Sequence, residues 1–377
     1  MNQLHLHIIA LDVPLPVDYG GVMDIFYKIR WLHALGVKIH LHCFTRGRPP
    51  QDELDNYCEE VFYYKRKNFL QAIPIRLPYM VASRDNSALL KNLQQDDHPI
   101  LLEGIQCSYL LGSDVLKNRK VFLRLHNAEF LYYEKLAIHE RNVLKRLYYK
   151  NESRLLKGYE KTISNKVPIL ALSHSDINLY KKLFGALHTF FVPAFTGWDM
   201  VTSIEGRGKY CLYHGNLSIN ENEKAVEWLL NDVFRNTGIP LIIAGKSPSE
   251  SLERFIEGFS NCSLVENPTD HDLQDLIHKA QINVLPSFNN TGVKLKLLNA
   301  LYNGRHCLVN AASVEGASIP DLCYVADTAE DFIKKMRELF LQDFSREDIL
   351  QRQKLLSTFY NNEKNAAAVI AMVREGS

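Results

Sequence analysis

The sequence lacks the cysteine spacing of zinc-binding and disulfide-rich proteins. Its seven cysteines are scattered over 377 residues, and no two of them form a C-x-x-C motif. This argues against a cysteine zinc site and against a disulfide framework. Because most of them lie in or beside apolar runs, we expect reduced, buried thiols in a cytosolic protein. The cysteines are Cys43, Cys58, Cys107, Cys211, Cys262, Cys307 and Cys323.

Long hydrophobic runs and a basic leader are also missing. No stretch approaches ~18 uninterrupted apolar residues, the length that a membrane-spanning helix needs. Residues 1–13 contain no basic region, and their apolar run is broken by His5, His7 and Asp12. We interpret this segment as a first strand rather than a signal peptide.

The chain has little net charge and none of several familiar motifs. Lys and Arg total 44 against 43 Asp and Glu, so no overall field favours nucleic acid, which we do not expect as a partner. There is no Walker G-x-x-x-x-G-K-S/T, G-x-S-x-G, H-E-x-x-H or regular G-x-G-x-x-G. No repeat of about 20 to 50 residues is visible, which argues against solenoids and propellers.

Short apolar runs alternate with amphipathic ones over nearly the whole chain, which is typical of a parallel sheet with crossover helices. Strands are predicted at 4–11, 37–43, 61–64, 99–103, 120–125, 167–172 and 188–192, and then at 210–213, 240–244, 262–265, 282–285, 307–309 and 322–325. Helices are predicted to begin at Gly21, Asn68, Asn86, Cys107, Ala128 and His174. The fold class is therefore α/β.

The two strand series predict two domains, as expected at roughly 100 to 200 residues per domain. We expect a Rossmann-like domain over 1–193, a linker over 194–208 and a second Rossmann-like domain over 209–345, with a cleft between the domains. The tail 346–377 is helical. It either closes the second domain or crosses back onto the first.

The segment 289–299, Asn-Asn-Thr-Gly-Val-Lys-Leu-Lys-Leu-Leu-Asn, lies at a strand-to-helix turn, where α/β sheets hold ligands. A helix N-terminus disfavours cations unless an anion binds there, so Lys294 and Lys296 indicate a phosphate site. On a wheel of roughly 100° per residue, Lys294 falls within the apolar arc. Lys296, Asn299 and Asn303 form a polar face, and the alternative for both lysines is an ordinary surface position.

Two further turns in the first domain carry candidate residues. Gly20 and Gly21 open a helix after the first strand, where paired glycines let a ligand approach the backbone. His126 and Glu129 follow the fifth strand at the same predicted edge. His126 could donate a hydrogen bond or shuttle a proton, and Glu129 also suits the first turn of any helix.

In the second domain, Gly215 and Asn216 end the first strand, and Lys246 follows the second. The carboxyl ends of adjacent parallel strands line one crevice, so these residues are expected near Thr291 and Gly292. Lys246 is interpreted either as a phosphate partner or as an exposed loop lysine.

Residues 135–166 are basic and amphipathic, with nine Lys or Arg against three Glu. Such a helix can lie on anionic lipid, which would place the protein peripherally at the inner face of a membrane. A long crossover helix with a solvated basic face has the same pattern.

Taken together, these segments resemble the GT-B glycosyltransferases, and most closely the retaining family 4. The resemblance covers nearly the whole chain and is most specific over 284–316. It rests on Gly20-Gly21, on His126-Asn127-Ala128-Glu129, on 214–218 and on 291–298.

The resemblance implies an acceptor-binding first domain and a second domain that binds a nucleotide-diphosphate sugar. The diphosphate would lie at Thr291, Gly292, Val293, Lys294 and Lys296, with Gly21 near it and His126 near the donor sugar. It further implies hexose transfer with retention, without a bound metal or other cofactor. The acceptor would be a glycan, a lipid-linked sugar or a similar molecule, as in polysaccharide biosynthesis.

The chain departs from the family pattern at several positions. Thr291 and Asn299 replace the two acids of an E-x7-E motif, and a neutral amide is a poorer acceptor for ribose hydroxyls than a carboxylate. Asn216 and Glu221 stand where many members carry Arg and Lys. The alternatives are therefore a non-catalytic sugar-nucleotide-binding protein and a nucleotide-sugar epimerase.

Overall fold

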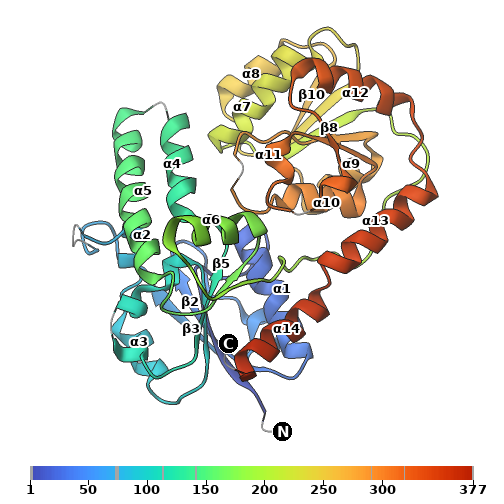
Figure 1. Ribbon diagram of the computed structural model, residues 1–377. Coiled ribbons are helices and arrows are strands. Elements are labelled where there is room, and N and C mark those ends of the chain that lie inside the picture. The colour runs from blue at the N-terminus through green and yellow to red at the C-terminus, as the bar shows by residue number, and fades with distance from the viewer. Residues whose placement is uncertain are drawn as a thin grey trace. The chain divides into compact units, whose positions relative to one another are not determined.

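A computed structural model describes residues 3–72, 76–112, 114–140, 142–289, 291–317 and 319–375 (Figure 1). The chain forms two compact units. The first comprises Met1–Gly197 and Tyr360–Ser377, and the second comprises Trp198–Phe359. Each unit contains one parallel sheet with helices packed on it.

The first unit has seven strands in the order β3-β2-β1-β4-β5-β6-β7. Its strands are β1 His5–Ala10, β2 Lys38–Thr45, β3 Glu60–Lys65, β4 Ile100–Glu103, β5 Val121–Leu125, β6 Ile169–Ala171 and β7 Thr189–Phe191. Its helices are α1 Gly20–Ala34, α2 Tyr79–Ala82, α3 Ser87–Leu93, α4 Glu129–His139, α5 Val143–Ile163, α6 His174–Phe184 and α14 Asn362–Glu375, with short 3-10 turns η1 Asp52–Asn56, η2 Ile105–Cys107, η3 Tyr109–Gly112 and η4 Asp114–Leu116.

The second unit has six strands in the order β10-β9-β8-β11-β12-β13. Its strands are β8 Cys211–Asn216, β9 Leu241–Lys246, β10 Cys262–Glu266, β11 Ile282–Val284, β12 His306–Val309 and β13 Tyr324–Val325. Its helices are α7 Asn220–Trp228, α8 Glu250–Glu257, α9 Asp270–Lys279, α10 Leu295–Asn303, α11 Ala311–Val314, α12 Ala329–Leu341 and α13 Arg346–Phe359, with η5 Leu229–Phe234 as a π-helical turn and η6 Pro320–Leu322 as a 3-10 turn.

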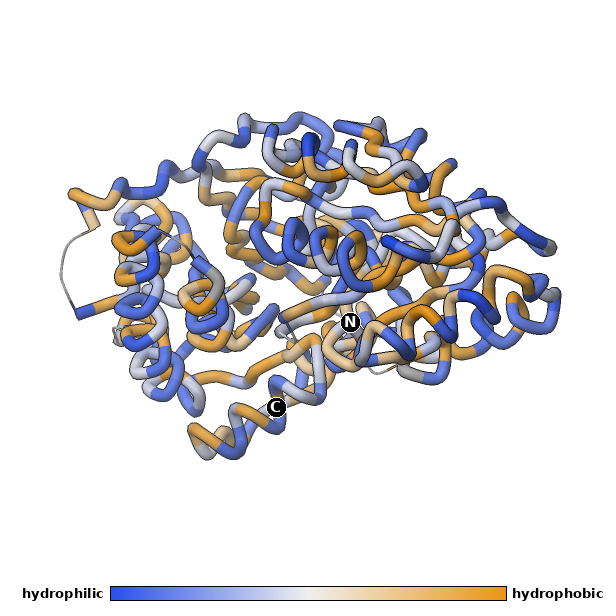
Figure 2. Tube along the Cα trace, turned by 90° about the horizontal axis from the view of Figure 1, so that it is seen from above, coloured by the Kyte–Doolittle hydropathy of each residue, from blue (hydrophilic) through white to orange (hydrophobic). Residues whose placement is uncertain are grey.

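Every predicted strand is present, and all pairings within the two sheets are parallel. The predicted α/β class is thus confirmed. The strands are easy to recognise because a parallel sheet is covered on both faces and its strands are continuously apolar. In β1, Leu6 and Ile8 pack into the core on one face, and Ile9 packs into the core on the other. Along the covering helices, hydrophobic and hydrophilic residues alternate (Figure 2).

Some helix predictions were wrong. Asn68 begins only a turn, and Cys107 lies in the 3-10 turn η2. The basic segment 135–166 is not one helix but spans two, α4 and α5, which run side by side (Figure 1). The side chain of Asn142 caps α5 by accepting hydrogen bonds from Leu144 N and Lys145 N. A cap residue in extended conformation inside an amphipathic run marks a new helix start.

The C-terminal tail forms two helices that belong to different units. Helix α13 lies in the second unit, whereas α14 packs beside α1 in the first (Figure 1). Ala366, Val369 and Val373 of α14 are buried in the core that α1 shares with the sheet. Of the two alternatives for the tail, a return to the first domain is therefore the one observed.

All seven cysteines are free, and each is buried or half-buried, as predicted. Burial raises the pKa of the Cys107 thiol to about 12, so this thiol is protonated and unreactive at neutral pH. Among the described residues, no helix is long and apolar enough to cross a membrane.

Candidate functional site

Both sheets have a topological switch point, where the strand order reverses. In the first sheet it lies between β1 and β4, and in the second between β8 and β11. Ligands in open α/β sheets bind beyond the carboxyl ends of the strands at such points.

At the first switch point, Asp24 of α1 pairs with Arg124 of β5. Arg124 donates from Nη2 to Asp24 Oδ1 at 2.8 Å and from Nε to Oδ2 at 3.1 Å. Both side chains are at most 2% exposed. Burial alone would raise the pKa of Asp24, but the positive charges of Arg124 and Lys28 outweigh burial and hold the pKa far below its usual value. Asp24 is therefore ionised.

Lys28 extends this pair to the end of β4. Its ammonium lies 2.7 Å from Asp24 Oδ2 and 2.8 Å from Glu103 Oε1. Glu103 also accepts a hydrogen bond from His126 Nε2 at 3.0 Å. Burial raises the pKa of Glu103, but Lys28 and His126 outweigh burial and lower it. Two carboxylates and two cations thus form a buried network that balances in charge, with His126 at its edge.

The same network fixes the chain that leaves the first sheet. Arg124 donates to the carbonyl oxygens of Val192 at 2.6 Å and Pro193 at 2.9 Å. Asp24 Oδ1 accepts from Phe195 N at 2.9 Å. Helix α1, strand β5 and the segment after β7 are therefore joined through one ion pair.

The side chains of Asp24, Glu103 and His126 lie close enough together to hold a metal ion. However, the Lys28 ammonium already bridges the two carboxylates, at hydrogen-bond distance from each. A cation would have to displace this buried lysine, so the donor set suits the ammonium rather than a metal.

Glu129 occupies a separate buried position at the start of α4. Gln106 Nε2 donates to Glu129 Oε1 at 3.1 Å. Burial raises the pKa of Glu129 to about 7, and the hydrogen bond from Gln106 opposes this only in part. A carboxyl group that titrates near neutral pH can act as a proton donor or acceptor.

Gly20 and Gly21 form the first turn of α1, as predicted. A side chain at position 21 would have its Cβ 3.1 Å from the ring of Tyr19. Gly104, which follows β4, has φ of +89°, and a Cβ there would meet Gln106. Without a Cβ at these two positions, Tyr19 and Gln106 pack directly against the backbone of the loops at the first switch point.

The buried network was largely missed by sequence reasoning. Asp24, Lys28, Glu103 and Arg124 were read only as parts of a helix and two strands. A signal was present, because Asp24 and Lys28 are four residues apart within the apolar face of α1. Charged residues in such a face need partners, and an i, i+4 pair of opposite sign points to buried ones.

At the second switch point, the loop after β11 is held in a tight turn. Asn289 Oδ1 accepts from Thr291 N at 2.9 Å and from Thr291 Oγ1 at 2.8 Å. Gly292 has φ of +65°, and a Cβ on Gly316 would lie 2.3 Å from Gly292 O. Position 292 therefore needs glycine for its positive φ, and position 316 needs glycine because a Cβ there would clash with the carbonyl oxygen of Gly292. Asn290, also part of the predicted segment, lies outside the described residues.

The two lysines differ from their predicted arrangement. Lys294 is the N-cap of α10 and lies outside the helix, and its ammonium donates to Thr291 O at 2.9 Å. Lys296 lies in the first turn and points inward, with Nζ 3.0 Å from Asn222 Oδ1 and 4.7 Å from the centre of the Tyr213 ring. The prediction that Lys296 lies on a polar surface was wrong, because the polar face of α10 also packs inside the unit, and residues 297–303 are all buried.

Burial lowers the pKa of Lys296 to about 8, although the negative charge of Glu221 opposes the shift. Glu221, in the first turn of α7, also accepts a hydrogen bond from Ser287 Oγ at 2.7 Å. The positive charge of Lys296 is thus partly removed from water and is balanced in part by Glu221. Such an ammonium can bind an anion favourably.

Asn299 and Asn303 are buried rather than on a polar face, which corrects the wheel prediction. Asn303 Nδ2 donates to Asn299 Oδ1 at 2.7 Å, and Asn303 Oδ1 accepts from Thr202 Oγ1 at 2.7 Å. The amide oxygen of Asn299 is therefore already engaged within the unit.

The remaining candidates lie on β8 and β9, whose last residues are paired, Asn216 beside Lys246. Asn216 Oδ1 accepts from Ser218 N at 3.1 Å, which shapes the loop before α7. Lys246 is exposed, and the half-buried Gly215 packs beneath the side chain of Asn222. Val293, the last candidate, is half-buried between Gly292 and Lys294.

His214 was part of the predicted β8 segment, although it was not chosen as a site residue. It is buried, and its Nε2 has no hydrogen-bond partner among the described residues. Burial and the charge of Lys296 lower its pKa to about 3, so the ring is neutral.

Residues 208–342 match the family model of the glycosyl transferases group 1. This range contains β8, β9, the loop after β11 and α10. The match supports a glycosyltransferase.

Three further proteins are similar to this chain over most of its length, one in sequence and two in structure. A protein described as an uncharacterized 44.6 kDa protein in the cps region of Klebsiella pneumoniae is 26% identical over 326 residues, covering 82% of this chain and 83% of that protein. HepE of Anabaena, solved with UDP and glucose, has a TM-score of 0.67 at 9% identity over 99% of this chain and 100% of its own. A TarM mutant of S. aureus, solved with UDP among other ligands, has a TM-score of 0.66 at 10% identity with the same coverage. The structural likeness shows the GT-B fold.

Arg124→Met should lower the free energy of unfolding by about 3–5 kcal/mol, because Asp24 would remain ionised and buried with fewer cations beside it. The double variant with Asp24→Asn should lose less than the sum of the two single variants. Urea denaturation of the four proteins measures this coupling. The control is Lys38→Met, which breaks a surface pair with Glu59 and should cost less than about 1 kcal/mol. Additive losses would contradict the network.

Glu129→Gln should stabilise the protein at pH 8 and have little effect at pH 4. The unfolded chain releases this proton near pH 4.5, whereas the folded protein keeps it to about pH 7. The wild type therefore loses stability as pH rises between these values, by a total on the order of 3 kcal/mol. Urea denaturation at pH 4, 6 and 8 tests this. The exposed Glu134 on the same helix provides the control variant Glu134→Gln, for which no pH-dependent difference is expected.

Proposed function

We propose that this chain is a glycosyltransferase that moves a hexose from a nucleotide-diphosphate sugar to a glycan, a lipid-linked sugar or a similar acceptor. Transfer would proceed with retention and without a bound metal. The observation that carries the proposal is the inward-pointing Lys296 at the start of α10, with its lowered pKa. This lysine lies within the range that matches the group 1 family model.

The second unit would bind the donor diphosphate. The first turn of α10 offers a positive dipole end, as other helix N-termini do for phosphates. Lys296 and Lys294 add two positive charges close to Gly292, whose φ of +65° sets the turn before the helix. As the sugar–phosphate bond breaks, negative charge develops on the diphosphate, and fixed positive charges stabilise it.

The first unit would bind the acceptor. His126 donates from Nε2 to the ionised Glu103, which orients the imidazole ring. Its other ring nitrogen, Nδ1, would form a hydrogen bond with a substrate hydroxyl. Glu129, with a pKa of about 7, would serve as a second group able to exchange a proton. The relative from a cps region supports a glycan acceptor and polysaccharide biosynthesis.

A second candidate is a protein that binds sugar nucleotides without transferring the sugar. Asn299 favours it, because the position lacks a carboxylate and its amide oxygen already accepts from Asn303. Donor binding with no transfer over a panel of acceptors, unchanged in Asn299→Glu, would support this candidate. An epimerase would instead form product from the donor alone.

Lys296→Met should weaken binding of the donor nucleotide by ~10-fold or more, because a charge-assisted contact contributes on the order of 1.5 to 3 kcal/mol. Lys294→Ala should act in the same direction. Glu221→Gln should strengthen binding, because it removes the negative charge beside Lys296. Wild-type affinity should also fall as pH rises through about 8, where Lys296 loses its proton.

A thermal-shift screen with UDP, GDP, ADP and TDP identifies the nucleotide, since binding to the folded state raises its stability. UDP is tested first because HepE and TarM were solved with it. Calorimetry then measures the three variants against Lys209→Met, a change of an exposed lysine before the amino end of β8. Equal affinity in Lys296→Met and wild type would refute the proposed diphosphate site.

We also propose that the hairpin of α4 and α5 contacts an anionic membrane. Its end exposes several large apolar side chains: Ile138 by 69%, Val143 by 57%, Leu144 by 78% and Leu147 by 57%. Both glutamates of α5 face inward, where Glu152 accepts from Met80 N and Glu160 from Phe130 N. The exposed bases of α5 therefore have no glutamate of the same helix beside them, and the exposed Glu134 of α4 is the acid that lines the groove next to three of them. These bases are Lys145, Arg146, Lys150, Arg154, Lys157 and Lys161.

A groove between the two helices adds a pocket of about 420 Å³. Phe130 and Ile138 line it together with the bases Lys150, Arg154 and Lys157. This combination of apolar and basic side chains suits the boundary between acyl chains and phosphate headgroups.

Leu144→Ser with Leu147→Ser should reduce binding to phosphatidylserine vesicles by more than ~10-fold, since burial of each leucine contributes about 1.5–3 kcal/mol. Co-sedimentation with vesicles of pure phosphatidylcholine and of mixed phosphatidylserine separates the apolar from the electrostatic part. Leu350→Ser, at a 59% exposed leucine of α13, is the control and should bind as the wild type does. Equal binding by the double variant would rule out the hairpin as the contact surface.

A further inference from the structure

Five histidines gather at the amino-terminal edge of the first sheet, opposite the carboxyl ends of its strands. His5 and His7 belong to β1, His40 and His42 to β2, and His98 lies shortly before β4. These strands are neighbours in the sheet. Because side chains alternate along a strand, all four strand histidines lie on the face that also carries Ile9 and Phe44.

The inner pair of histidines is fully engaged. His7 Nδ1 lies 2.8 Å from His42 Nε2, His7 Nε2 lies 3.0 Å from Asp96 Oδ1, and His42 Nδ1 lies 2.8 Å from Tyr64 Oη. Burial lowers the pKa of His7 to about 4 and that of His42 to about 3. The inner pair is therefore a neutral, structural part of the core.

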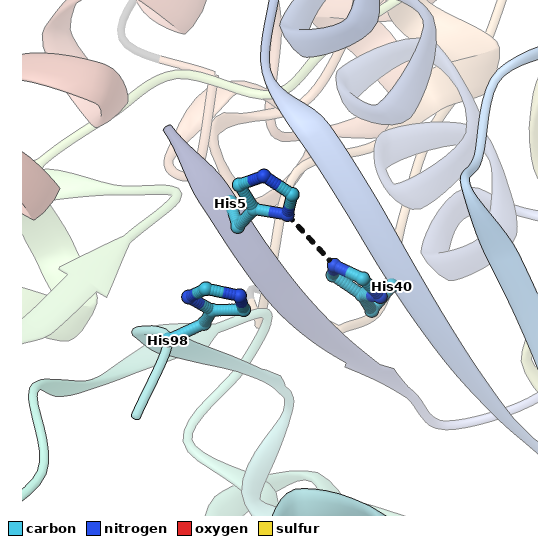
Figure 3. Close-up of side chains that lie close together, drawn as sticks. All are labelled: His5, His40 and His98. Carbon is cyan, nitrogen blue, oxygen red and sulfur yellow. Dashed lines mark hydrogen bonds between the residues drawn. The ribbon is translucent and has the colours of Figure 1, made fainter. Parts of the chain in front are cut away.

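The outer three, His5, His40 and His98, are only half-buried and lie close together with their rings stacked (Figure 3). His5 Nδ1 lies 3.0 Å from His40 Nε2. The ring of His98 stacks on His5 with their centres 4.5 Å apart. One ligand nitrogen from each ring lies within 4.8 Å of the others.

We propose that His5, His40 and His98 form a binding site for a divalent transition-metal ion such as Zn²⁺. In tetrahedral zinc sites with Zn–N distances of about 2.0–2.1 Å, ligand nitrogens are about 3.3 Å apart. His5 and His40 already approach this spacing, and His98 reaches it by a movement of its ring. A water molecule would complete the coordination.

Glu60 prepares His40 for this role. His40 Nδ1 lies 2.9 Å from Glu60 Oε2. Since a carboxylate accepts hydrogen bonds, Nδ1 donates to Glu60, and the ring is thereby oriented with Nε2 toward His5. A histidine that donates its second nitrogen to a carboxylate is the usual arrangement of a metal ligand.

The charges around the three rings do not oppose a dication. Lys38 is paired with Glu59, and Arg119 is held by Asp96 and by the carbonyl oxygen of His98.

The ion would join β1, β2 and the segment before β4. Because it lies at the edge opposite Gly20, His126 and Glu129, it takes no part in the proposed sugar transfer. We therefore expect the metal to stabilise the first unit, and this inference stands whether or not the chain is a glycosyltransferase.

The test uses tag-free protein freed of metal with EDTA. Calorimetry with Zn²⁺ should show one equivalent bound, and Co²⁺ should give the visible absorption of tetrahedral cobalt. Both His40→Ala and His98→Ala should bind Zn²⁺ at least ~10-fold more weakly, and Glu60→Gln should lose about 10-fold through the orientation of His40. Zn²⁺ should raise the unfolding temperature of the wild type but not that of His40→Ala.

The control is His188→Ala, an exposed histidine of the same unit that should leave zinc affinity unchanged. Circular dichroism confirms that each variant is folded, and the half-buried position of His98 makes His98→Ala the safest of them. Wild-type zinc affinity in His98→Ala and His40→Ala, or no binding of one equivalent by the wild type at micromolar zinc, would overturn the site.

Discussion

The ion pair between Asp24 and Arg124 is the interaction on which the first unit depends. Through it, helix α1 is fixed to strand β5, and the chain leaving β7 is fixed to both. Two ions removed from water are stabilising only when each is fully satisfied. Here Lys28 and Glu103 complete the balance, so each carboxylate faces a cation and each cation a carboxylate. The geometry at the end of β4 follows from this requirement.

The network also determines what His126 can do. Glu103 is ionised because Lys28 lies beside it, and an ionised Glu103 fixes the proton of His126 on Nε2. The second unit follows a different logic. There the ammonium of the half-buried Lys296 contacts two neutral groups, Asn222 and Tyr213, and Glu221 is the carboxylate that acts on its charge. A network in which every charge is paired orients its side chains and needs no ligand. A cation whose charge is only partly balanced favours the binding of an anion.

The sequence predicted every strand, because strands covered on both faces are continuous apolar runs bounded by turn residues. It predicted the turns at Gly20 and Gly292 for the same reason. It predicted a polar surface for Lys296 wrongly, since a helical wheel shows which residues share a face but not whether that face is covered, and the polar face of α10 packs inside the unit. It could not reveal the network around Asp24, whose partners Glu103 and Arg124 are 79 and 100 residues away.

The two edges of the first sheet show how the same fold handles buried polar groups in two ways. At the carboxyl edge, charges are kept and paired, and the cations exclude a metal from Asp24 and Glu103. At the amino edge, burial keeps His7 and His42 neutral, and both form hydrogen bonds within the core. The outer histidines, His5, His40 and His98, are the ones we propose for a metal. A charge-balanced carboxyl edge positions His126 for a hydroxyl group, whereas an edge of neutral imidazoles suits a cation.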